Sequence, residues 1–289
     1  MADSRCFIQF PHPGGEHQPD PSGHKSWNTY AHAHARKFMR IEGRWTDERG
    51  QQHSGQLRAW GEWEAQSDLL QELDRPDSWD LPQYLWLPYY TDRPNGYERL
   101  HNTDPFIFGD RFLYSNCKQA KRPNLRNLER GSVIAFGSKK RHGWVLDTVL
   151  VVADSFDYLA ADTPTALEGH VPDAFLHVTG GPLADNDATE TLRLYRGATP
   201  DDPVDGMFSF FPADTAEDNV GFERPIIELP ANWFTPTLAQ GYKKNHLPPD
   251  ALSELWQSLV EQVLDAGLLL GTHAELPEQR KPLHQRSEG

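Results

Sequence analysis

The stretch that decides the fold runs from residue 102 to residue 152 and reads NTDPFIFGDRFLYSNCKQAKRPNLRNLERGSVIAFGSKKRHGWVLDTVLVV. Near its end, the apolar runs at 132–136 and 144–152 have the length and the β-branched composition of strands. The segment GSKKRHG joins them, and its glycines permit the sharp turn that a hairpin needs. The sequence therefore predicts a hairpin with a basic tip.

Positive charge is concentrated around this hairpin. Between residues 117 and 141, eight lysine or arginine residues accompany one acid, Glu129, although the whole chain has a net charge of −14. Clustered cations attract phosphates whatever the global charge, so the patch indicates a polyanion partner, although an ordinary solvated surface explains it equally well. The residues predicted to contact phosphate are Lys118, Arg122, Lys139, Lys140 and Arg141.

Composition restricts the class of protein. The 289 residues are 37% apolar and 24% charged, as in a globular protein, and no apolar run approaches the roughly 20 residues of a membrane helix. The first residues lack the apolar core of a secretory signal. Two cysteines, Cys6 and Cys117, provide neither a disulfide framework nor a cysteine-based zinc site. We expect a soluble cytoplasmic protein with no cofactor and no membrane partner.

The chain is predicted to form one elaborated domain over residues 1–271. A plausible N-cap and helical spacing at 28–40 predict a short helix near its start. Sixteen acids against three basic residues make the part after the hairpin strongly acidic, and a capped amphipathic pattern predicts a later helix. The predicted parts are a basic barrel-like part at about 55–152, an acidic part at about 153–240, a helix at about 250–267 and a flexible tail at 272–289.

Carboxylates offer the clearest candidates for chemistry. Residues 56–64, QLRAWGEWE, alternate with the period of a strand, so Glu62 and Glu64 project together beside aromatic side chains. Such a carboxylate suits cleavage of a glycosidic bond, because it can activate water or stabilise an oxocarbenium-like centre. Asp104 is a second candidate acid. Asp147 interrupts an apolar strand, so it is either satisfied by a turn or an arginine or kept for function.

Histidines gather near the start of the chain. Imidazoles can bind zinc or iron, but His32 and His34 diverge on a helix, and the spacing matches no known compact metal site. No phosphate-binding loop, dinucleotide fingerprint or serine-hydrolase elbow is present, and Cys117 has no recognised nucleophile context. A metal-dependent enzyme nevertheless stays open as an alternative. The early histidines are His12, His17, His24, His32 and His34.

Five motifs carry a family resemblance. They are WGEWE at 60–64, NTDPFIFG at 102–109, FLYSNCKQ at 112–119, GSVIAFGS at 131–138 and LDTVLVV at 146–152. The hairpin motifs resemble the PUA-like small barrels, such as the EVE, YTH and ASCH domains, and the longer set is similar to a bacterial anti-phage DNA glycosylase family that removes hypermodified cytosine. The resemblance implies an α+β fold with a PUA-like barrel core, flanking helices, and nucleic-acid bases as the ligand class.

The resemblance and the carboxylates together lead to a hypothesis of a DNA glycosylase whose partner is DNA with modified bases. In it, Glu62 or Asp104 activates water or stabilises the sugar cation, and Glu64 orients it. A flipped base needs an aromatic-lined pocket, and a non-catalytic reader of modified bases would use the same pocket without a carboxylate. The predicted base-binding residues are Trp60, Trp63, Phe108, Tyr114, Asn116 and Gln119.

Overall fold

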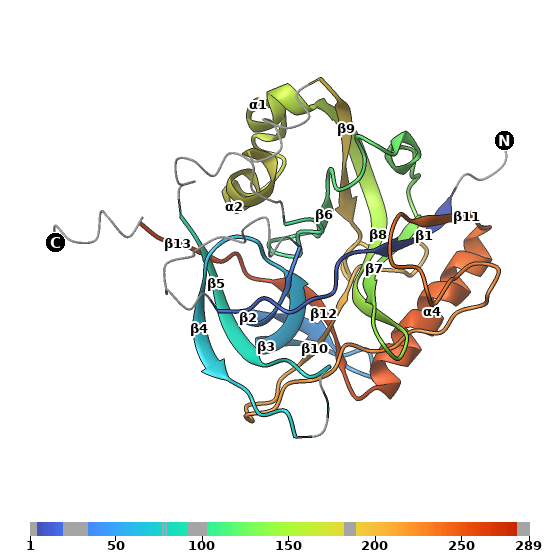
Figure 1. Cartoon of the computed structure of the whole chain (residues 1–289). Coiled ribbons are helices and arrows are strands. Elements are labelled where there is room, and N and C mark those ends of the chain that lie inside the picture. The colour runs from blue at the N-terminus through green and yellow to red at the C-terminus, as the bar shows by residue number, and fades with distance from the viewer. Residues whose placement is uncertain are drawn as a thin grey trace.

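The computed structural model describes residues 5–19, 34–76, 78, 80–91, 103–181 and 189–281. Two β-sheets make up most of this part of the chain, and one long helix, α4 (Pro249–Asp265), packs on the outer face of the first sheet (Figure 1). The predicted C-terminal amphipathic helix is therefore confirmed. The mixed fold, which is mostly sheet, agrees with the predicted α+β class.

The first sheet contains the predicted hairpin. Across the sheet its strands are β11 (Lys243–His246), β1 (Cys6–Pro11), β7 (Val133–Lys139), β8 (Trp144–Leu159), β9 (Thr191–Gly197) and β6 (Leu113–Tyr114). β1 runs parallel to β7, whereas β7 and β8 pair antiparallel on either side of the basic tip. The first ten residues of β8 are all buried, because other elements cover both faces of this central strand.

The second sheet is built around a long hairpin. Its strands in order are β12 (Leu269–Ala274), β10 (Phe211–Asp214), β3 (Gln52–Glu62), β2 (Arg36–Thr46), β5 (Tyr84–Tyr90) and β13 (Glu278–Gln279), and β4 (Ser67–Glu72) also pairs with β5. β2 and β3 are antiparallel over eleven residues each, and β12 pairs with β2 as well as with β10. The strand predicted at 56–64 is thus the second half of β3 and the residues after it.

The strands are divided between two sheets, and they do not form the single closed barrel that the resemblance implies. In the first sheet, the two end strands β11 and β6 are not paired with each other, so this sheet stays open. The apolar residues of β7 are divided between two hydrophobic cores, one on each face of the first sheet. Ile134 and Phe136 belong to the core between the sheets, whereas Val133 and Ala135 belong to the core beneath α4.

Two local predictions differ from the structure. Residues 28–33 of the predicted helix lie outside the described residues, but 36–40 belong to β2, where Arg36 and Phe38 pair with Glu62 and Trp60 of β3. Pairing of β2 with β3 in the tertiary structure overrides the weak helical spacing at these residues. The tail predicted from residue 272 begins inside β12, because the backbone there pairs with β2 and β10.

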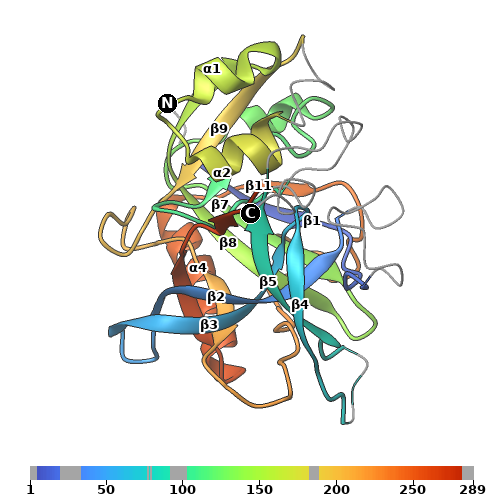
Figure 2. The ribbon, with the colours of Figure 1, turned by 90° about the vertical axis from the view of Figure 1, so that its left-hand side faces the viewer.

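Several short helices complete the described part of the chain. They are η2 (Pro123–Arg126), η3 (Ala160–Asp162), α1 (Thr163–Leu167), α2 (Asp173–Phe175) and η4 (Leu176–Gly180). Figure 2 shows α1 and α2 beside β9, at the opposite end of the molecule from the β2–β3 hairpin. Among the described helices, none is both long enough and apolar enough to cross a membrane.

Candidate functional site

A buried polar cluster lies where the two sheets meet. His12 directly follows β1 of the first sheet, and its backbone N–H donates to the Gly137 carbonyl of β7 at 2.7 Å. Arg36 begins β2 and pairs in register with Glu62, the last residue of β3 in the second sheet. Cys117 joins them from the loop after β6. The ends of strands from both sheets therefore bring together side chains that are far apart in the sequence.

Three of these side chains form a continuous series of contacts. The Sγ atom of Cys117 lies 3.2 Å from Nε2 of His12, and Nδ1 of the same ring lies 3.3 Å from Oε2 of Glu62. His12 and Glu62 are buried, whereas Cys117 is only partly buried. A thiol, an imidazole and a carboxylate in this order are the arrangement that activates a nucleophile in covalent catalysis.

Burial and the neighbouring charges set the resting protonation of the three groups. Burial lowers the pKa of His12 to about 4, so its ring is neutral at neutral pH and can accept a proton. Burial, together with the carboxylates Asp104 and Glu62, raises the pKa of the Cys117 thiol, which therefore rests in its protonated form. Although burial alone would raise the pKa of Glu62, Arg36 and His12 hold it well below its usual value.

A buried ion-pair network connects the cluster to β8 of the first sheet. Asp147 of β8 accepts hydrogen bonds from Arg36 Nε at 3.0 Å and from Arg224 Nη1 at 2.8 Å. Arg36 Nη1 also lies 3.0 Å from Oε2 of Glu62, so the network connects β8 to the end of β3. The possibility that an arginine satisfies Asp147 is thus confirmed. Both arginines are buried, and the guanidinium of Arg224 lies over the Trp60 ring.

Asp104 holds the backbone of the loop at residues 115–117. Its carboxylate accepts N–H bonds from Ser115 at 3.1 Å, Asn116 at 3.0 Å and Cys117 at 2.7 Å. It is 1% exposed, and burial raises its pKa to about 7 against the opposing effect of these three bonds. Asp104 therefore positions Cys117, and its buried oxygens are engaged with the backbone and not directed at a ligand.

Glu62 and Glu64 do lie together, as the alternation of the strand predicts. His34 connects them, because its Nδ1 atom is 2.8 Å from Oε1 of Glu62 and 3.3 Å from Oε1 of Glu64. The backbone N–H of His34 also donates to Oε1 of Glu64 at 2.8 Å. The His34 side chain is 30% exposed, whereas both carboxylates are buried, so this histidine is the part of the cluster that reaches solvent.

The residues predicted to bind a base lie in the interior. The indole of Trp60 donates to the Phe222 carbonyl at 2.9 Å, and that of Trp63 donates to the Gln66 carbonyl at 2.7 Å. Phe108 and Tyr114 are fully buried in the core between the sheets. The remaining two, Asn116 and Gln119, are engaged in loop hydrogen bonds with Ser115 and with the Arg193 backbone. As they are placed here, the four rings have no open face for a base.

The predicted phosphate contacts divide into two groups. Lys118 points inward, where its Nζ atom donates to the carbonyls of Pro11 at 2.6 Å and Gly241 at 2.8 Å. Lys139 and Arg141 are exposed at the tip between β7 and β8, with Lys140 partly buried beside them, and Arg122 is exposed on a separate loop. Among the described residues, no carboxylate forms an ion pair with any of the three tip residues. The tip is therefore available to an anion.

The basic tip is close to the cluster. A Cβ atom placed on Gly14, two residues after His12, would touch Ser138 and the Lys140 side chain. The charges of Arg224 and Asp147 also influence Lys140, whose pKa is lowered by burial first and by Arg224 second. An anionic substrate held by the tip would consequently lie near the polar cluster.

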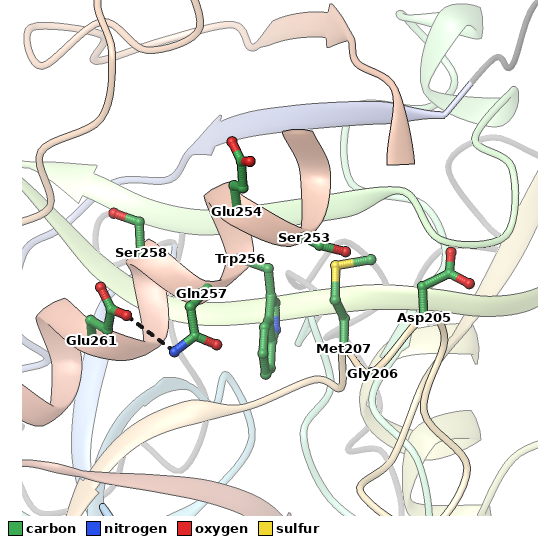
Figure 3. Close-up of a pocket in the computed structure, with 9 residues that line it drawn as sticks. All are labelled: Asp205, Gly206, Met207, Ser253, Glu254, Trp256, Gln257, Ser258 and Glu261. Atoms are coloured by element: carbon green, nitrogen blue, oxygen red, sulfur yellow. Dashed lines mark hydrogen bonds between the residues drawn. The ribbon is translucent and has the colours of Figure 1, made fainter. Parts of the chain in front are cut away.

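A separate pocket of about 520 Å3 lies between α4 and the turn at residues 205–207 (Figure 3). Trp256 and Met207 form its apolar part, while Glu254 and Glu261 project from the helix. None of the residues lining this pocket belongs to the polar cluster. Its lining holds no histidine, cysteine or basic residue. We place the candidate site at Cys117, His12 and Glu62 because of the contacts among these three side chains.

Sequence reasoning missed Arg36, Arg224 and the link between His12 and Cys117. In the sequence, His12 is one of several histidines and Cys117 is a thiol without a nucleophile context, because the two are 105 positions apart. The only local signal was the position of His12 directly after a strand. No protein-family model, no curated protein and no solved structure matches this chain.

Proposed function

We propose that this chain is an enzyme of the acyl-transfer class, in which Cys117 is the nucleophile, His12 is the general base and Glu62 orients His12. The observation that carries the proposal is the proximity of the three groups, with Sγ 3.2 Å from Nε2 and Nδ1 3.3 Å from Oε2. Partial exposure of Cys117 supports it, since a nucleophile must be reachable. A reducing cytoplasm, where thiols stay free, suits this chemistry.

The proposed reaction follows from the positions of the protons. His12 Nε2 takes the proton of Cys117 as Sγ attacks the carbonyl carbon of an ester or amide, and Glu62 offsets the charge on the imidazolium. The same proton then passes to the leaving group as its bond to carbon breaks, which leaves a thioester on Cys117. Water, activated by His12, attacks the thioester carbon and releases the acid and the thiol.

An activated ester tests this proposal. We expect p-nitrophenyl acetate to give a burst of nitrophenolate and an acetyl thioester that mass spectrometry maps to Cys117. Cys117→Ala should abolish both signals. Cys6→Ala is the matched control, because Cys6 also has a histidine nitrogen nearby, His246 Nδ1 at 3.5 Å, but is fully buried. An unchanged burst in Cys117→Ala would exclude Cys117 as the nucleophile.

A second candidate is hydrolysis of the N-glycosidic bond of a modified base in DNA. The observation that favours it is the ionised Glu62 carboxylate beside the partly exposed His34, with the unpaired basic tip nearby. Glu62 would stabilise the sugar cation, and Lys139, Lys140 and Arg141 would contact phosphates. The similarity of the five motifs to an anti-phage glycosylase family supports the same ligand class.

DNA that carries plain or glucosylated hydroxymethylcytosine tests the second candidate. We expect a glycosylase to leave alkali-labile sites at the modified base alone, and Glu62→Gln to remove them while Cys117→Ala does not. DNA that is retained by the protein but stays intact would support the alternative of a non-catalytic reader. Loss of cleavage in Cys117→Ala would instead assign the reaction to the thiol.

A further inference from the structure

We propose that His34, Glu62 and Glu64 bind one divalent transition-metal ion. The three side chains each offer one ligand atom, and these atoms lie within 4.8 Å of one another. This inference does not depend on the proposed nucleophile, because Cys117 is not among the three ligands. It also differs from a metal site made of the early histidines alone, since carboxylates from β3 supply two of the ligands.

The backbone register explains why these residues converge. In the antiparallel β2–β3 hairpin, Arg36 lies opposite Glu62. His34 precedes β2 in a turn with φ 58°, and its backbone N–H donates to Oε1 of Glu64 at 2.8 Å, which places His34 beside the end of β3. Glu62 and Glu64 are two residues apart, so in extended chain they project from the same face. Two neighbouring chain segments therefore present three metal-binding groups at one point.

The distances are close to those of a bound ion. Nδ1 of His34 lies 2.8 Å from Oε1 of Glu62 and 3.3 Å from Oε1 of Glu64. Ligand atoms that are each about 2.0–2.2 Å from one ion lie roughly 3.0–3.5 Å apart in tetrahedral or octahedral geometry. Small rotations of the side chains would thus be enough to admit an ion.

The balance of charge also points to a cation. Glu62 has Arg36 as its partner, whereas Glu64 has only His34 among the described ionisable side chains. Glu64 is 1% exposed, and its Oε2 atom has no hydrogen-bond partner within the described part of the chain. A buried carboxylate costs several kcal/mol unless it is paired. A divalent ion would compensate this charge and engage the free oxygen.

The donor set indicates which metals fit. One imidazole nitrogen and two carboxylate oxygens suit Zn²⁺, Mn²⁺ or Fe²⁺, whereas Mg²⁺ and Ca²⁺ prefer oxygen alone. Three protein ligands leave at least one position open for water or substrate, as in catalytic sites. The 30% exposure of His34 allows that position to reach solvent.

Metal titration of the full chain tests the inference. After dialysis against a chelator, we expect Zn²⁺ or Mn²⁺ to bind at one equivalent per chain, measured by calorimetry and by elemental analysis. Glu64→Gln and His34→Ala should each weaken binding by about 100-fold or more, since even residues behind the ligands typically contribute 10–100-fold. Because the His34 side chain is partly exposed, we expect His34→Ala to fold. Metal binding by this variant therefore tests the site even if Glu64→Gln does not fold.

Two controls separate this site from others. His53→Ala should bind metal normally, although His53 Nε2 lies 2.9 Å from Oδ2 of Asp47 in an exposed histidine–carboxylate pair. Cys117→Ala should also retain one equivalent, so failure of the proposed thiol chemistry would leave the metal result intact. No binding by the unaltered protein, or full binding by His34→Ala, would overturn the inference and leave His34 as a hydrogen-bonding partner of Glu64.

Discussion

Replacing Asp147 by asparagine is expected to lower the free energy of unfolding by about 3–5 kcal/mol, the cost of removing one partner from a buried ion pair. Asp147 is the acid that pairs with Arg224, at 2.8 Å, and both side chains are about 4% exposed. Arg36 keeps Glu62 as a partner when Asp147 loses its charge, whereas the partners of Arg224 that remain among the described residues are neutral acceptors such as the Gly14 carbonyl. Urea unfolding followed by tryptophan fluorescence measures the loss.

The same strand supplies the control for this prediction. Asp154 of β8 pairs with Arg196 at 2.6 Å, but the two side chains are 43% and 34% exposed. Exposed pairs contribute about 0–1 kcal/mol, so Asp154→Asn should change stability little. Adding Arg224→Gln to Asp147→Asn should recover part of the loss, because it removes the uncompensated charge. Equal effects of Asp147→Asn and Asp154→Asn would mean that the buried network does not stabilise the fold.

Replacing His12 by asparagine is expected to slow acylation of Cys117 by about 10²–10⁴-fold, the usual contribution of a general base. The asparagine amide lies roughly where Nδ1 lies, so it can still donate to Glu62, but it places no base beside the thiol. Burial raises the pKa of that thiol, so without His12 very little thiolate forms at neutral pH. The rate of the nitrophenolate burst measures the change.

A second histidine with a carboxylate partner provides the comparison. His53→Asn should leave the burst rate unchanged, because His53, at the exposed start of β3, pairs with Asp47 of the turn between β2 and β3. A thermal melt of each variant shows whether the fold is kept. If His12→Asn acylated at the rate of the unaltered protein, His12 would be a structural histidine, and Cys117 would react without a base.

The parts of the fold that local pattern predicted are those with a strong local signal. The β7–β8 hairpin and α4 have apolar residues in runs or at spacings typical of their own element, and glycines lie at the hairpin turn and after the helix. In α4 the N-cap position is Pro248, and Asp250 lies in the first turn without a capping hydrogen bond. The residues at 36–40 show why weaker patterns fail. Their spacing is compatible with a helix, but pairing with β3 and β5 provides backbone hydrogen bonds that the spacing cannot reveal.

The site was predicted in part. Alternation along one strand was enough to place Glu62 and Glu64 on the same face, and the apolar surroundings of Asp147 were enough to require a partner for it. The interior positions of Trp60 and Trp63 could not be predicted, since an aromatic ring suits a core and a ligand pocket equally. Which of the two it occupies depends on the neighbouring elements.

The sequence by itself determined the two carboxylates at the end of β3, the basic tip and the hairpin that presents it, because each depends on residues within a few positions of one another. Only the tertiary structure decided that His12 meets Cys117 and Glu62, and that Arg36 and Arg224 share Asp147. These contacts join ends of strands from two sheets. Such long-range contacts depend on strand order and on how the sheets pack, and a local periodic pattern in the sequence carries no information about either.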